Sequence, residues 1–213
     1  MSKNISNTTN KALSRNRKLA LTGAFSALII VLSLTNLGFI AFSPMVSITI
    51  LQIPVILCAT LAGELEGIFA GFVMGIMSLI KAAMSPTGIL DPLFVNPLCS
   101  VLPRMLLGLV AWGFWRLFNF IPKIPKTLSA ALTGFLATFA HTLMVYACIF
   151  IFEGADIRVA LESIGMAGAG FFAVVAAGIV SELAEATASL LVCAAVYAGL
   201  FIASNKKSKL SQE

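Results

Sequence analysis

Long apolar runs, separated by short polar or Pro- and Gly-containing connections, dominate the sequence. The runs are continuous and do not alternate with a period of two, so they predict helices and not the strands of a membrane barrel. We expect six helices, at about 18–36, 47–62, 67–84, 99–118, 129–152 and 171–203. The second is short for a span of roughly 20 residues, and we expect it to continue into the preceding segment. The pattern therefore predicts an all-α integral membrane protein, a bundle of six transmembrane helices.

Composition agrees with this fold class. Hydrophobic residues make up 59% of the chain and charged residues 11%, whereas a soluble domain is about a quarter charged. The mean hydropathy is +1.00. The net charge of +5 does not indicate nucleic-acid binding, because the basic residues lie at the ends of apolar runs, where they set membrane orientation.

The basic residues also predict the topology. Five lie in residues 1–18, three in 116–126 and three in the tail. With six spans, these three segments lie on the same side of the membrane, and only Lys81 and Arg158 lie on the other side. Basic residues are enriched on the cytoplasmic side, so eleven basic residues against two predict that both termini are cytoplasmic. We expect a polar, basic N-terminus at 1–17, disordered and then turning at the interface, an uncleaved membrane domain at 18–204 and a basic tail at 205–213.

A stripe of glycines and a nearly uncharged loop lie near the middle of the sequence. Glycines recur every four residues at positions 63, 67, 71 and 75, which places them on one helical face and lets another backbone approach closely. Acidic residues 64 and 66 are expected to mark a tight turn before the helix. The Pro- and Gly-rich segment 85–98 follows, and such a segment is most stable when protein covers it.

Ionisable residues within the predicted spans are the candidates for function, because they are costly in a bilayer. Arg104, His141, Glu182 and Glu185 could converge on one outward-facing cavity that captures a small polar solute. Structural alternatives stand beside this interpretation. Arg104 and Glu185 could neutralise each other, His141 could serve packing, and only one of the two glutamates could face the cavity. Lys81 is expected to reach the outer interface.

Several chemistries are not indicated by any motif. The chain has no GxxxxGK[ST] phosphate loop and no HExxH, and its four cysteines lack metal-ligand spacing, so we expect no metal and no cofactor. A binding subunit that takes its energy from partners is the simplest interpretation. The alternatives are a small membrane enzyme using Glu182, Glu185 and His141 as acid and base groups, and a purely structural subunit.

The chain resembles the S components, the substrate-binding membrane subunits of energy-coupling factor (ECF) vitamin transporters, over about residues 15–204. The most specific match is the block Asn96-Pro97-Leu98-Cys99-Ser100-Val101-Leu102-Pro103-Arg104. Further matches are Ile53-Pro54-Val55-Ile56, the glycine stripe, Ser78-Leu79-Ile80 and the pair Ser181 and Glu185. Within the family, the block from Asn96 is most similar to subunits for pantothenate and related vitamins.

The resemblance implies a six-helix bundle that binds a water-soluble vitamin and docks onto a transmembrane T component carrying two ATPases, which hydrolyse the ATP. It implies a substrate site formed by Asn96, Arg104, His141, Thr142, Ser181 and Glu185. It also implies a docking face of small residues on the first helix, at Ala20, Gly23, Ala24 and Ala27. Such sequences often carry Asn at the position of His141, and Asn is also common at the position of Ser181. Arg104 suits a carboxylate-bearing vitamin such as pantothenate.

Overall fold

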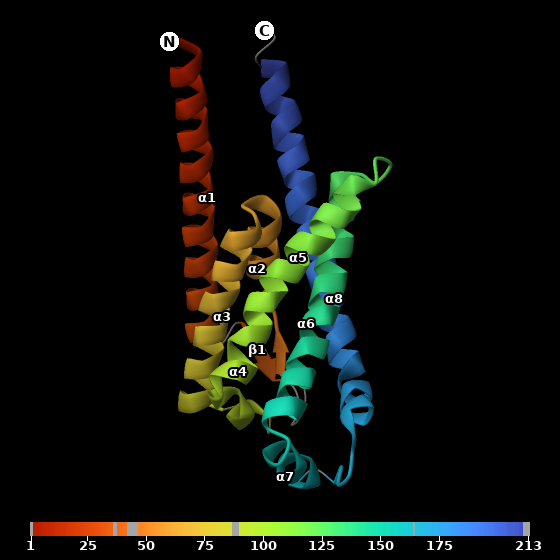
Figure 1. Ribbon diagram of the computed structural model, residues 1–213. Helices are drawn as coiled ribbons and strands as arrows, with labels where there is room; N and C mark the ends of the chain where they lie inside the picture. The colour runs from red at the N-terminus through yellow and green to blue at the C-terminus, as the bar shows by residue number, and fades with distance from the viewer. Residues whose placement is uncertain (1, 36–37, 42–46, 87–89, 164, 211–213) are drawn as a thin grey trace.

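The computed structural model describes residues 2–35, 38–41, 47–86, 90–163 and 165–210 (Figure 1). The long helices, in chain order, are α1 (Ser2–Leu34), α3 (Glu64–Met84), α5 (Leu102–Phe120), α6 (Lys126–Phe152) and α8 (Phe171–Leu210). The shorter ones are α2 (Gln52–Leu61), the 3-10 helix η1 (Asp91–Val95), α4 (Pro97–Ser100) and α7 (Asp156–Ser163). Strands β1 (Phe39–Ala41) and β2 (Ser47–Thr49) form one hairpin.

The helices form a bundle with both chain ends at the same end of the molecule and α7 at the opposite end (Figure 1). In the described part of the chain, five helical segments are long and apolar enough to cross a membrane. They are Arg15–Leu34, Glu64–Met84, Pro97–Phe120, Lys126–Phe152 and Gly178–Asn205. The apolar helix α2 is shorter and almost wholly buried between its neighbours. The protein is therefore a multi-pass, all-helical membrane protein apart from one small hairpin.

The start of the predicted second helix is a strand and not a helix. Residues 47–49 pair with β1 in antiparallel register, Phe39 opposite Thr49, and α2 begins only at Gln52. Pairing with β1 gives the backbone groups of this segment hydrogen-bond partners, which a chain at membrane depth requires. Hydropathy alone could not separate this arrangement from a helix, because a three-residue segment is too short to show the period of either structure. Part of the expected loop, residues 42–46, lies outside the described residues.

The N-terminal segment also differs from its prediction. We expected residues 1–17 to be disordered and then to turn at the interface, but α1 is one helix from Ser2 to Leu34. Once the apolar half of a helix has formed, each added residue extends it with one further hydrogen bond, so polar residues can continue it outward.

Three of the four stripe glycines bring helix backbones into contact. A Cβ atom at Gly67 would lie 2.5 Å from that of Ala59 in α2, one at Gly75 would lie 2.6 Å from Cα of Val101, and one at Gly71 would overlap the carbonyl oxygen of Arg104. A Cβ atom added at Gly108 of α5 would likewise overlap the backbone carbonyl of Gly67. The stripe therefore lets α3 pack directly on α2 and α5.

The fourth glycine is not part of that helical face. Gly63 precedes α3 with a φ of 135°, a conformation that L side chains rarely adopt, and it forms the turn between α2 and α3. The predicted turn residues Glu64 and Glu66 are instead the first turn of α3, where acidic side chains favour the positive end of the helix dipole.

The segment before Arg104 is folded and compact. η1 and α4 occupy much of the predicted loop at 85–98, and the helix predicted from residue 99 is divided into α4 and α5 at Val101. Pro103 at the start of α5 explains the division, because proline has no N–H and fits the first turn of a new helix. The predicted surface helix within 153–164 is confirmed as α7.

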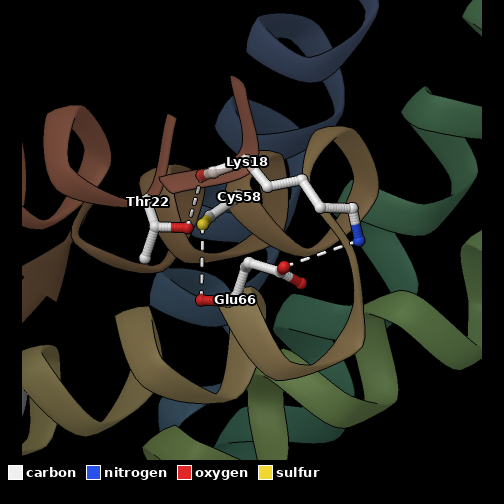
Figure 2. Close-up of polar contacts among 4 residues, drawn as sticks. All are labelled: Lys18, Thr22, Cys58 and Glu66. Carbon is white, nitrogen blue, oxygen red and sulfur yellow. Dashed lines mark hydrogen bonds and ion pairs between the residues drawn. The ribbon is translucent and has the colours of Figure 1, made fainter. Parts of the chain in front are cut away.

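Polar contacts join α1, α2 and α3 at the end of the bundle that carries the termini (Figure 2). Lys18 forms an ion pair with Glu66 at 3.4 Å, and Cys58 Sγ lies 3.4 Å from the Glu66 carbonyl oxygen, to which it donates. Thr22 Oγ1 donates to the carbonyl oxygen of Lys18 at 2.9 Å. Partly exposed pairs of this kind stabilise a fold little, so the packing of these three helices rests on the buried apolar side chains that they share.

The substitution Gly71→Ala tests the helix crossing. The added methyl group would overlap the backbone of α5, so the helices must separate, and overpacking of this kind costs about 1–3 kcal/mol. We expect the apparent melting temperature of the purified protein to fall by several degrees. Gly113→Ala on α5 is the control, because nothing lies within 4 Å of its added Cβ atom. Equal melting temperatures for the two variants would contradict the close crossing.

Candidate functional site

One cavity lies in the half of the bundle away from the chain ends. Its volume is about 120 Å³. Its polar lining comes from four helices, η1 and β2: Thr49, Ser78, Lys81, Asp91, Arg104, His141, Thr142, Tyr146, Ser181, Glu182 and Glu185. Its apolar lining is Ala82, Leu90, Phe94, Val145, Ile149 and Gly178. An apolar wall with a few convergent polar groups is typical of a small-molecule site.

Arg104 lies at the start of α5 and is buried, as the sequence predicted. Its Nη1 donates to the carbonyl oxygen of Cys99 at 2.7 Å, and its guanidinium lies 4.6 Å from the ring centroid of Phe94. Its Nε has no hydrogen-bond partner among the described residues. The backbone contact and the aromatic ring hold the guanidinium in place at the cavity wall.

α6 and α8 supply three further residues of the predicted site. His141 is buried against the cavity, and its Nε2 has no partner within the described ranges. Thr142 and Ser181 also line the cavity, and Ser181 Oγ lies 3.3 Å from the carbonyl oxygen of Gly178, to which it donates. These three positions converge because α6 packs along the length of α8.

Glu185 binds the protein with both of its carboxylate oxygens. Oε1 accepts a hydrogen bond from the backbone N–H of Thr49 at 2.7 Å, and Oε2 accepts one from Nε2 of Gln52 at 2.7 Å. No ion pair joins it to Arg104 in the part of the chain that the structure describes, so the neutralising pair considered from the sequence does not form. Glu185 instead fastens the hairpin and the start of α2 to α8.

Glu182 lines the same cavity, so the alternative in which only one of the two glutamates reaches it does not hold. Residues three apart on a helix lie on one face, and both carboxylates reach the cavity from neighbouring turns. Glu182 is buried, and its Oε1 has no hydrogen-bond partner among the described residues.

Asn96 lies outside the cavity lining. Its Oδ1 accepts a hydrogen bond from the N–H of Leu98 at 2.9 Å, which caps α4, and its Nδ2 donates to Oε1 of Glu153 at 2.5 Å. The cap fixes the direction of α4. In this structure the side chain therefore joins α4 to the end of α6.

The small residues of α1 face outward. Ala20, Gly23, Ala24 and Ala27 are exposed, and nothing lies within 4 Å of a Cβ atom added at Gly23. This face is free of the rest of the bundle.

Sequence reasoning missed several members of the cavity. Lys81 was expected at the outer interface, and Asp91, Phe94, Tyr146 and Thr49 were given no role, yet all line the cavity. The sequence held one indication that α2 binds a buried polar group, since Gln52 is a single amide in an apolar run.

The fold and the cavity define a multi-pass membrane protein that can bind a small polar solute. Residues 17–197 match the family described as the ECF transporter, substrate-specific component. The chain belongs to this family, and it is a transporter subunit and not an enzyme. The family needs no cofactor in this subunit, since partner ATPases hydrolyse the ATP.

Two curated relatives are similar to this chain. One is the pantothenic acid transporter PanT of Lactococcus lactis subsp. cremoris (strain MG1363), 27% identical over 158 residues, which are 68% of this chain and 78% of the relative. The other is the pantothenate transporter PanT of Leuconostoc mesenteroides subsp. mesenteroides, 30% identical over 141 residues, which are 62% of this chain and 67% of the relative.

The substitution Glu185→Ala tests the role of this carboxylate. It would leave the N–H of Thr49 and the amide of Gln52 without their acceptor, and we expect a loss of about 2–4 kcal/mol of stability. The apparent melting temperature of the ligand-free protein measures this loss.

Glu185→Gln is the matched control for that experiment. The new amide keeps an acceptor for Thr49, and Gln52 can turn its amide, because Gln52 Oε1 has no partner within the described residues. We expect a melting temperature near that of the unsubstituted protein. A Glu185→Ala variant as stable as the Gln variant would contradict the role of Glu185.

Proposed function

We propose that this S component captures pantothenate from outside the cell. The observation that carries the proposal is the buried Arg104, which lines a cavity that carboxylate, hydroxyl and imidazole side chains also line. Such a site suits a ligand with an anionic group and several hydrogen-bonding groups. Pantothenate has a carboxylate, an amide and two hydroxyls. A charge-assisted contact with Arg104 would anchor the carboxylate.

The two PanT relatives support this choice of vitamin. Both are named for pantothenate, and the similarity spans about two thirds of this chain. A related vitamin or precursor with a carboxylate is the alternative that the same cavity could hold.

Membrane orientation follows from charge. We propose six spans, the sixth formed by the short apolar α2 together with the adjoining hairpin, and cytoplasmic termini. Both chain ends lie at the same end of the bundle (Figure 1). Most basic residues lie in the two terminal segments and in the connection at 116–126, and basic residues favour the cytoplasmic side. The cavity, in the opposite half, would then open to the outside.

Transport would require partners. We propose that a transmembrane T component and two ATP-binding-cassette ATPases drive release inward, and that the T component docks on the small-residue face of α1. Exposed Ala20, Gly23, Ala24 and Ala27 support this, because small side chains allow a foreign helix to approach closely.

A thermal-shift screen against water-soluble vitamins and precursors tests the substrate. A ligand that binds only the folded state raises the apparent melting temperature. We expect the largest rise with pantothenate, and loss of the rise in Arg104→Ala, because the carboxylate then has no cation to bind. A rise that survives in Arg104→Ala would contradict the anchoring role, and a rise with another vitamin alone would replace pantothenate.

The substitution Ala24→Trp tests the docking face. The bulky ring would hold a partner helix away from α1, so we expect loss of co-purification with the T component and ATPases but unchanged vitamin binding. Leu191→Trp is the control, because Leu191 is an exposed apolar residue on α8, 61% accessible. Complex formation by Ala24→Trp equal to that of the control would place the docking surface elsewhere.

A further inference from the structure

Two buried glutamates one turn apart on α8 have different surroundings. Glu185 accepts hydrogen bonds from Thr49 and Gln52 on both oxygens. Glu182 is equally buried, at 6% exposure, but its Oε1 has no partner among the described residues. A buried acceptor without a donor is costly, and that cost is removed when a donor enters the cavity.

We propose that Glu182 is the acidic ligand contact of the cavity and accepts a hydrogen bond from a hydroxyl group of the substrate. Glu185 is a positioning residue that holds the hairpin and α2. This inference rests on the proposed function, since it assigns a second anchor to the same site. The family resemblance placed Glu185 and not Glu182 in the substrate site, so this assignment exchanges the roles of the two glutamates.

The order of the helices gives the ligand a direction. α6, which carries His141, packs against both α5, which carries Arg104, and α8, which carries Glu182. All three residues line the cavity, and each has one buried side-chain atom without a partner within the described residues: Nε of Arg104, Nε2 of His141 and Oε1 of Glu182. A guanidinium and a carboxylate therefore line the cavity from two different helices.

This polarity selects a class of substrate. A ligand with an anionic group at one end and hydroxyl donors toward the other satisfies both walls. A dicarboxylate would bring its second anion against the acceptor side, and a cation would meet Arg104. The Thr142 side chain, which interacts with the Glu182 carboxyl, helps to fix its orientation.

Titration calorimetry of the purified full chain tests the assignment. The ligands are pantothenate and its two analogues in which one hydroxyl is replaced by hydrogen. We expect the unsubstituted protein to bind at least one analogue about tenfold more weakly than pantothenate, the usual effect of losing one well-formed hydrogen bond. In Glu182→Ala we expect pantothenate to bind about tenfold more weakly and the preference over that analogue to disappear.

Loss of the preference separates a ligand contact from a structural role, which would weaken all three ligands by the same factor. Glu182→Gln keeps the side-chain volume and provides a folded variant if the alanine variant fails to fold. It should weaken binding and reduce the preference, because an amide oxygen is a poorer acceptor than a carboxylate. Glu64→Ala, which removes a carboxylate from the far end of the bundle, should leave every affinity unchanged.

The outcomes distinguish this inference from the proposed function. If pantothenate fails to bind but another vitamin binds, pantothenate is the wrong substrate, and the same cycle is run with that vitamin and its analogue lacking the donor. An undiminished preference in both Glu182 variants would overturn the assignment. An unsubstituted protein that binds no compound would contradict both the proposed function and this inference.

Discussion

The direct backbone contact between α3 and α5 is the constraint on which the site depends. Gly67, Gly71 and Gly108 bring the two helices together without intervening side chains, and the carbonyl of Arg104 lies at the contact itself. The same residue therefore lies at this helix crossing and lines the cavity with its side chain. Any side chain added at Gly71 would displace the start of α5 and with it the cation that faces the ligand.

The cavity divides its polar groups into two kinds. Glu185 and the Nη1 atom of Arg104 are bound to the protein and hold β2, α2 and α4 in place. His141 Nε2, Glu182 Oε1 and Arg104 Nε are buried without partners in the described part of the chain. In a medium that offers no water, partners for such groups must come from protein or ligand. This division explains how a small bundle can be stable and still keep groups available for binding.

The long helices could be predicted from the sequence because hydropathy depends only on composition over about 20 residues. The hairpin could not, since the three-residue segment 47–49 at the start of an apolar run reads equally as helix or strand until its partner strand is known. The convergence of Arg104, His141 and the glutamates was predicted from their cost in a bilayer. Which glutamate is bound by the protein was not, because that depends on where the backbone of Thr49 lies.

An experimental structure of the chain with its bound vitamin tests the central claim most directly. The account predicts ligand density in this cavity, with the anionic group on Arg104 and a hydroxyl of the ligand donating to Glu182. Density in the cavity with the anion directed away from Arg104 would contradict the account. So would a vitamin bound at another place on the bundle while this cavity holds only water or lipid.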